Sequence, residues 1–186
     1  MKKWMKEMNA ETVTPDNAAL ASQYLFEGGH LEKLKDWHAA AAAYRRALAA
    51  NSPDPRARYF ANNNLGYVLL QMEQCEEAAD LCRNAIAIDA ERYNAHKNLG
   101  LAFQGQGQWL DAAWCFLEAT RLCPGDARAW QLLEHLLQAR PRLLDQDAEQ
   151  GRAFAMTHAA LEEHGYLREP LRQSAAFKLT PILPDQ

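Results

Sequence analysis

Apolar residues recur at spacings of three and four over most of the chain between residues 18 and 140. Such spacing places the apolar side chains on one face of a helix. Short polar segments, several of them with proline or glycine, separate these runs and are typical of helix ends. The pattern therefore predicts a succession of short helices joined by tight turns.

A second regularity is superimposed on the helical one, because one pattern of residues occurs twice at a distance of 34 positions. Leu65-Gly66 recurs as Leu99-Gly100, Ala78 as Ala112, Cys82 as Phe116 and Ala85 as Ala119. A period in this range is the signature of a repeat array. A unit of two helices cannot bury its own apolar face, so units stack and form a curved surface.

The two repeated glycines indicate how the helices of one unit pack. Gly66 and Gly100 stand inside helical patterns, where glycine costs about 1 kcal/mol relative to alanine. We expect close approach of the second helix to offset this cost, with Ala78 or Ala112 at the crossing. A side chain at either glycine would then push the two helices apart.

Further residues at fixed offsets accompany both copies. The second copy carries Leu99, Gly100, Phe103, Ala112, Phe116, Ala119 and Pro124, and the first carries Leu65, Gly66, Ala78 and Ala85, with departures at Leu69, Cys82 and Ala90. This set resembles the tetratricopeptide repeat. The resemblance covers about residues 18–140. It implies an all-α fold, a right-handed α-solenoid (superhelix) of stacked antiparallel helix pairs that binds peptides.

The register extends the array toward the N-terminus. Gly28 and Tyr44 lie 38 residues before Gly66 and Cys82, so a first repeat precedes the two copies. Its spacing exceeds the 34-residue period by four residues, and we assign these to the proline-containing loop at 51–55. The array is therefore expected to hold three full repeats.

The helix signals predict three parts in the chain. These are an N-terminal extension over residues 1–14, an array over 15–140 with repeats at 21–54, 59–92 and 93–126 and a partial fourth at 127–140, and a capping helix with a proline-containing tail over 141–186. Thr14 before Pro15 is typical of a helix start. Asp36 is expected to cap the next helix, and Pro141 to end the helix of the partial repeat.

Both ends of the chain leave alternatives open. Trp4, Met5 and Met8 belong either to a frayed leader or to an amphipathic segment that docks on the array or on a second copy. A helix at 145–164 is expected to cap the array, since exposed apolar ends are a liability of repeat proteins. Its predicted stripe is Gly151, Phe154, His158 and Leu161, and Gly165 follows it. The apolar tail at 179–184 is either disordered or lies on the array.

Charge and composition exclude several classes of function. The formal net charge of −4 and a pI near 5.9 argue against a nucleic-acid-binding protein, which usually shows a basic stripe. No apolar run approaches the ~18 residues of a membrane span, so we expect no membrane insertion. The expected location is cytoplasmic.

Motifs of catalysis and cofactor binding do not occur in the sequence, which lacks a P-loop, a complete dinucleotide glycine pattern, G-x-S-x-G and H-E-x-x-H. We therefore expect neither an enzyme nor a cofactor. The four cysteines lack zinc spacing and are expected to be small buried apolar residues. His158 and His164 flank two glutamates, where a solvated helix end is favoured over a metal site.

The resemblance places candidate ligand-binding residues on the first helix of each pair, which lines the concave face in that family. They are Asn63, Asn64 and Tyr67 from the second unit, Asn94, Lys97 and Asn98 from the third, and Arg128, Gln131 and His135 from the fourth. Each group shares one helix face by its spacing. Asn64 and Asn98 are equivalent, and an asparagine amide offers both a donor and an acceptor to a peptide backbone. A solvated polar surface is the alternative interpretation.

These observations favour an interaction module. The leading hypothesis is a scaffold that binds an extended peptide in the concave groove. Lys97 and Arg128 would favour an acidic segment or a terminal carboxylate. The alternative is a self-assembly module whose C-terminal tail docks on its own array or a neighbouring one, and a homodimer is one form of it.

Overall fold

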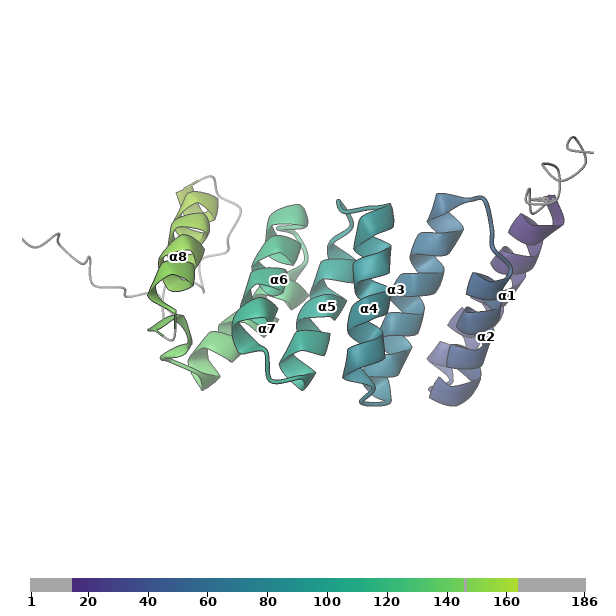
Figure 1. Ribbon diagram of the computed structural model, residues 1–186, viewed down its shortest axis with the longest axis horizontal. Helices are drawn as coiled ribbons and strands as arrows, with labels where there is room; N and C mark the ends of the chain where they lie inside the picture. Colours follow the sequence, from purple (N-terminus) through teal and green to yellow (C-terminus); the bar gives the residue numbers. More distant parts are fainter. Residues whose placement is uncertain (1–14, 146, 164–186) are drawn as a thin grey trace, which may run out of the picture. The chain divides into compact units, whose positions relative to one another are not determined.

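The computed structural model describes residues 15–145 and 147–163 of the chain. Within these ranges it is all-helical, with eight α-helices and one 3-10 turn (Figure 1). The helices are α1 (Pro15–Lys33), α2 (Trp37–Ala49), α3 (Pro55–Gln71), α4 (Cys75–Ile88), α5 (Tyr93–Gly105), α6 (Trp109–Leu122), α7 (Ala127–Ala139) and α8 (Ala148–Glu163), and the 3-10 turn η1 (Leu143–Asp145) precedes α8.

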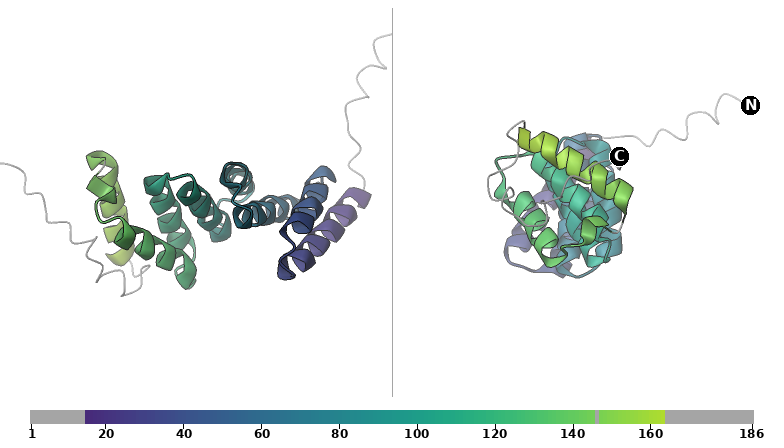
Figure 2. Two further views of the ribbon diagram at one scale, coloured as in Figure 1. Left: turned by 90° about the horizontal axis from the view of Figure 1, so that it is seen from below. Right: turned by 90° about the vertical axis from the view of Figure 1, so that its left-hand side faces the viewer.

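The chain divides into two compact units, Met1–Ala90 and Glu91–Gln186. The boundary falls between two helix pairs, so each pair lies within one unit. In the first unit α1 packs on α2, α2 on α3, and α3 on α4. The left view of Figure 2 also shows α1 and α2 side by side. In the second unit α5 packs on α6, α6 on α7, and α8 on η1 and α6.

Helix ends recur at the predicted register. The helices α2, α4 and α6 begin at Trp37, Cys75 and Trp109, which are 38 and then 34 residues apart. Asp36 caps α2 as expected, because its side chain accepts a hydrogen bond from the backbone N–H of Ala39 at 3.1 Å. The described helices therefore recur at the spacing read from the sequence.

The four extra residues of the first repeat do not lie in the loop, so that assignment is wrong. The helix α3 has 17 residues and α5 has 13, which places the extra residues at the start of α3. Pro55 occupies the first turn of α3, and the Asp54 carboxylate accepts a hydrogen bond from the backbone N–H of Arg56 at 2.9 Å. Proline at this position starts a helix, because the N–H it lacks would have no partner there.

The glycines of the repeat pattern face an aromatic ring across the helix pair. A Cβ atom added at Gly100 would lie 2.5 Å from Cε1 of Phe116, and one at Gly28 would lie 2.5 Å from Cε1 of Tyr44. Both rings are completely buried. The expected close approach is present, but the ring one helical turn beyond the predicted alanine is what requires it.

In the middle repeat, smaller groups lie where the two helices cross. A Cβ atom at Gly66 would lie 3.0 Å from Sγ of Cys82 and 3.3 Å from the carbonyl oxygen of Ala78. Cysteine replaces the ring here, so the backbone of Ala78 comes into contact range, as predicted for that residue. The crossing at Gly66 is therefore less crowded than the one at Gly100.

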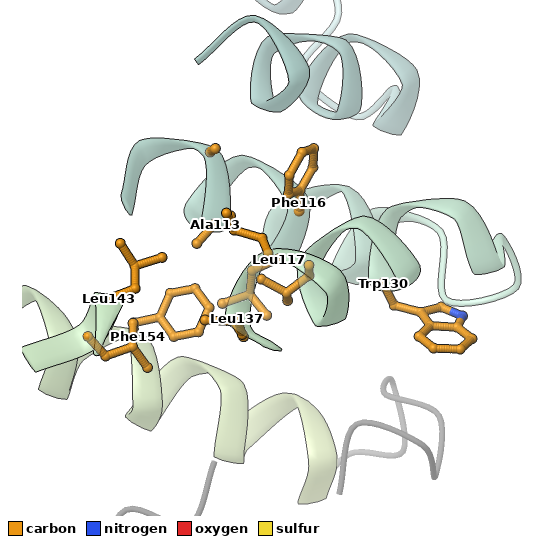
Figure 3. Close-up of a cluster of buried hydrophobic side chains, with 11 residues drawn as sticks. Ala113, Phe116, Leu117, Trp130, Leu137, Leu143 and Phe154 are labelled. Atoms are coloured by element: carbon orange, nitrogen blue, oxygen red, sulfur yellow. The ribbon is translucent and has the colours of Figure 1, made fainter. Parts of the chain in front are cut away.

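The second unit has a continuous apolar core that joins α6, α7, η1 and α8 (Figure 3). Phe116, Leu117, Leu137, Leu143 and Phe154 are each at most 1% exposed. In Figure 3 Leu143 and Phe154 lie close together, whereas Trp130 projects from α7 on the side away from Phe154. The last helix begins at Ala148 and a 3-10 turn precedes it, and its role as a cap of the array stays a prediction.

Three residues of the predicted stripe on α8 face the core. Phe154 contacts the Trp114 ring edge-on, with centroids 5.1 Å apart. Gly151 is buried, and a Cβ atom there would collide with the Leu144 carbonyl oxygen, so only glycine allows this approach. His158 is 2% exposed, so the expected solvated helix end is wrong at this residue. The Leu161 side chain, His164, Gly165 and the tail lie outside the described residues.

Burial lowers the pKa of His158 to about 4, because the charged imidazolium loses its hydration. We expect the unfolded chain to titrate near the ordinary value of 6.5. The neutral folded form is thus stable above pH 6.5. As pH falls from 6.5 toward 4 the unfolded state takes up the proton first, and stability decreases.

This behaviour gives the first testable expectation. Between pH 6.5 and pH 4.5 the free energy of unfolding should fall with a slope approaching about 1.4 kcal/mol per pH unit from this residue. His158→Leu should flatten the slope, whereas His38→Gln, at an exposed site, should leave it unchanged. The measurement is urea unfolding at several pH values. Equal slopes in wild type and His158→Leu would contradict the account.

Gly100→Ala should destabilise the second unit although alanine is the better helix former. The new methyl group collides with the Phe116 ring, and overpacking of this kind costs about 1–3 kcal/mol. Urea unfolding measures the effect. Gly125→Ala is the control, since a Cβ there meets nothing within 4 Å. Phe116→Leu should recover part of the loss in the double variant, and a Gly100→Ala variant as stable as wild type would show that the crossing is not tight.

Candidate functional site

The nine predicted ligand-binding residues fall into two groups, one in each unit. The α3 group comprises Asn63, Asn64 and Tyr67, and the second group comprises Asn94, Lys97 and Asn98 of α5 with Arg128, Gln131 and His135 of α7. Partners that the sequence did not point to complete both groups.

In the first unit, a chain of hydrogen bonds runs through the two asparagines. The Asn63 amide donates to Oδ1 of Asn64 at 3.0 Å, and the Asn64 side chain hydrogen-bonds the Tyr44 hydroxyl. Tyr44 in turn donates to Oε2 of Glu32 at 2.8 Å. Burial and the bond to Glu32 raise the pKa of Tyr44 far above its ordinary value, so the phenol stays a donor. The chain ties α1, α2 and α3 together and orients the Asn64 amide.

Tyr67 lies one turn beyond Asn64 and contacts α2. Its ring meets the Trp37 ring edge-on, with centroids 6.4 Å apart. Both side chains are half-buried. Aromatic rings that are partly exposed supply a large contact area at low entropic cost. Asn64 and Tyr67 therefore present an amide and an aromatic edge on the surface of the first unit.

In the second unit, Lys97 is a half-buried cation with neutral partners. Its ammonium donates to Oδ1 of Asn94 at 3.3 Å and lies 5.9 Å from the centre of the Tyr93 ring. Among the described residues no carboxylate lies within ion-pair distance of it. Burial lowers the pKa of Lys97, and the nearby Arg128 guanidinium lowers it further. The structure thus holds this positive charge at a cost.

Arg128 lies beside Lys97 and is anchored at the start of α7. Its Nε is 2.9 Å from Oδ1 and 3.0 Å from Oδ2 of Asp126, and its Nη2 donates to the Tyr93 hydroxyl at 3.0 Å. The guanidinium holds the pKa of the Asp126 carboxyl well below its usual range. Asp126 also caps α7 through the Arg128 backbone N–H. The Arg128 side chain is nevertheless 62% exposed and open to a ligand.

The cluster of Tyr93, Asn94, Lys97, Asp126 and Arg128 is called the Lys97 cluster here. It contains two cations and one carboxylate. Its net positive charge contrasts with a chain whose formal charge is −4. The arrangement is suited to a carboxylate, which would neutralise the second cation and accept hydrogen bonds from both.

The remaining candidates differ in accessibility. Gln131 and His135 are exposed on α7, at the spacing that places them along the Arg128 face. Asn98 is only 4% exposed, so its amide lies beneath the surface. Asn63 is 8% exposed. The accessible polar groups are thus fewer than the sequence pattern predicted.

Sequence reasoning missed four residues that shape these groups: Glu32, Trp37, Tyr93 and Asp126. Tyr93 stands four residues before Lys97, a spacing that places both on one helix face and was available as a signal. Asp126 follows Pro124-Gly125, which is typical of an N-cap. Glu32 had no such signal, because its contact with Tyr44 depends on the packing of α1 on α2.

Other candidate chemistry was also tested by the structure. The described residues include no cluster of three or more metal-ligating side chains. Cys82 is buried as expected, but Cys75, Cys115 and Cys123 are half-buried, so the prediction that all four are buried is wrong. No helix in the described ranges is long and apolar enough to cross a membrane.

Comparison with known proteins identifies the fold. No protein-family model and no curated protein matches the chain. The structure matches the TPR domain of Arabidopsis OM64 with a TM-score of 0.59 and 22% identity, over 64% of this chain and 96% of that one. It matches MamA (41-end) of Desulfovibrio magneticus RS-1 with a TM-score of 0.57 and 20% identity, over 77% and 74% of the chains.

A further crystal structure of MamA matches with a TM-score of 0.56 and 17% identity, over 78% of this chain and 80% of that one. At these identities the likeness shows the fold. The chain has the helix-pair fold of tetratricopeptide repeat domains, and the resemblance read from the sequence is confirmed at this level.

Proposed function

We propose that this protein is a non-enzymatic scaffold that binds a peptide segment of a partner protein. The repeat fold supports the proposal, because stacked helix pairs provide extended surfaces for partners. The Lys97 cluster supports it more specifically. A partly buried cation with no carboxylate within ion-pair distance is costly unless a ligand uses it.

The chemistry of the cluster favours an acidic segment or a C-terminal carboxylate. A ligand carboxylate between Lys97 and Arg128 would accept charge-assisted hydrogen bonds from both. Asp126 orients the Arg128 guanidinium and also competes with a ligand carboxylate for its hydrogen bonds. A ligand therefore binds most tightly when it contacts Lys97 as well. The centre of the Tyr93 ring lies 5.9 Å from the Lys97 ammonium. This geometry selects an anionic group over a neutral one.

The self-assembly alternative requires the C-terminal tail, which lies outside the described residues. Asp185 gives the tail a carboxylate side chain, which would compete with an external ligand for the cluster. We propose that the ligand belongs to an external partner, and we expect the protein to be cytoplasmic. The Asn64 amide and the Tyr67 ring of the first unit are proposed to hold the peptide backbone and an apolar side chain.

Lys97→Gln should weaken binding of acidic peptides by ~10-fold, as one charged hydrogen bond contributes about 1.5 kcal/mol or more. The probes are 16-residue peptides selected from a random displayed library on the full chain, and fluorescence anisotropy measures their affinity. Arg121→Gln is the matched control, since it removes one charge at an exposed i,i+3 pair of the same unit. Selected peptides without acidic enrichment, or equal losses in both variants, would contradict the assignment.

Asn64→Ala combined with Asn98→Ala tests the asparagine pair. The double variant should bind the same peptides more weakly while circular dichroism at 222 nm shows the helices retained. Asn98 is buried, so we expect most of the loss to come from Asn64. Single variants separate the two contributions. Retained affinity in the double variant would exclude these amides as ligand contacts.

A further inference from the structure

The outer face of α1 carries an unusual amount of exposed apolar surface. Phe26 is 82% exposed, the largest value among the exposed large hydrophobic residues of the described ranges. A shallow hollow surrounds it, lined by Leu25, Phe26, Gly29, His30 and Lys33. All five residues belong to α1, which is the outermost helix of the first unit (Figure 1).

The repeat register identifies what this face corresponds to. Phe26, Gly29 and His30 lie 38 residues before Asn64, Tyr67 and Val68 of α3. In α3 the first two of these positions contact the preceding helix. Asn64 hydrogen-bonds Tyr44 of α2, and Tyr67 meets Trp37 of α2.

Val68 is completely buried, whereas its counterpart His30 is exposed. The hollow on α1 is therefore a stacking face of the repeat that has no helix upon it among the described residues. A helix placed as α2 is placed on α3 would cover Phe26 and fill the hollow.

The outer face of α1 carries mostly small side chains, so it suits a partner helix with bulky ones. Ala19, Ser22, Phe26 and Gly29 follow one another at spacings of three, four and three along one side of α1, and Ala19 and Ser22 are exposed. Three of these four residues are small. Small residues let a second helix approach closely, so its own side chains must supply the bulk.

We propose that residues 1–13 of this chain form a helix that packs on the outer face of α1. The segment has the right length, since α2, which covers the equivalent face of α3, has 13 residues. Its large apolar side chains Met1, Trp4, Met5 and Met8 recur at i, i+3, i+4 and i+7, which places them on one helix face.

The connection also fits. The α2–α3 pair is antiparallel and joined by five residues, 50–54. A helix ending near residue 12 would reach α1 through residues 13 and 14, within the 2–5 residues usual for two antiparallel helices. Because the segment is covalently attached, its effective concentration at the face is in the millimolar range, which favours it over a second copy or an external helix.

Methionine methyl NMR of the full chain tests the proposal. The protein has five methionines, of which Met1, Met5 and Met8 are in the segment, and Met72 and Met156 serve as internal controls. With methyl-¹³C methionine, we expect nuclear Overhauser contacts between the Met5 or Met8 methyl and the Phe26 ring. Phe26→Ala should remove them and shift those resonances, while Met72 and Met156 stay in place.

Two results would overturn the proposal. One is that the three N-terminal methyls resonate as free methionine side chains, without contacts to α1. The other is that contacts appear in a mixture of differently labelled chains and grow with protein concentration, which assigns the face to a second copy. Light scattering on the same samples gives the mass and distinguishes contacts within one chain from those between chains.

Discussion

The helix pairs of this protein depend on one steric constraint, the seating of a side chain against a glycine. At Gly28 and Gly100 the aromatic ring of the second helix occupies the volume that a Cβ atom would need. The ring is buried only because the first helix lacks a side chain at that point. Glycine inside a helix costs about 1 kcal/mol, and burial of an aromatic side chain contributes more than this. Each of these helix pairs therefore retains its unfavourable glycine, because the two helices could not pack this closely with a larger residue there.

A similar balance of cost and gain in free energy explains where the charged side chains lie. Most ion pairs between the described residues are exposed, such as Arg45 with Glu77, and pairs of this kind contribute little. Lys97 differs because the packing of α5 removes part of its hydration and its partners are neutral. A repeat fold places its polar residues on the free faces of stacked helices. A partly buried cation on such a face therefore indicates a ligand-binding site better than the number of polar residues does.

The sequence predicted the helix pairs and their register because these depend on local spacing and on one recurring crossing. It failed where a contact joins separate helices. The ring against Gly100, the burial of Asn98 and the burial of His158 depend on how far one helix is displaced over another, and no spacing within one helix reports that. The extra turn of α3 was missed for a different reason, since a proline pair marks a helix start as well as a loop. The candidate site was therefore predicted in outline, with Tyr93 and Asp126 absent.

The turn between the two helices of each pair contains a residue with positive φ, and the type of residue at that position does not predict this geometry. Lys35, Glu73 and Gly107 occupy equivalent positions with φ of 59°, 60° and 76°, in the left-handed region that favours glycine. Two of the three are charged and exposed, so the packing of the flanking helices imposes the turn. These two side chains leave the turn into solvent. A fluorophore or surface linker coupled there would report on the array from outside its packing faces.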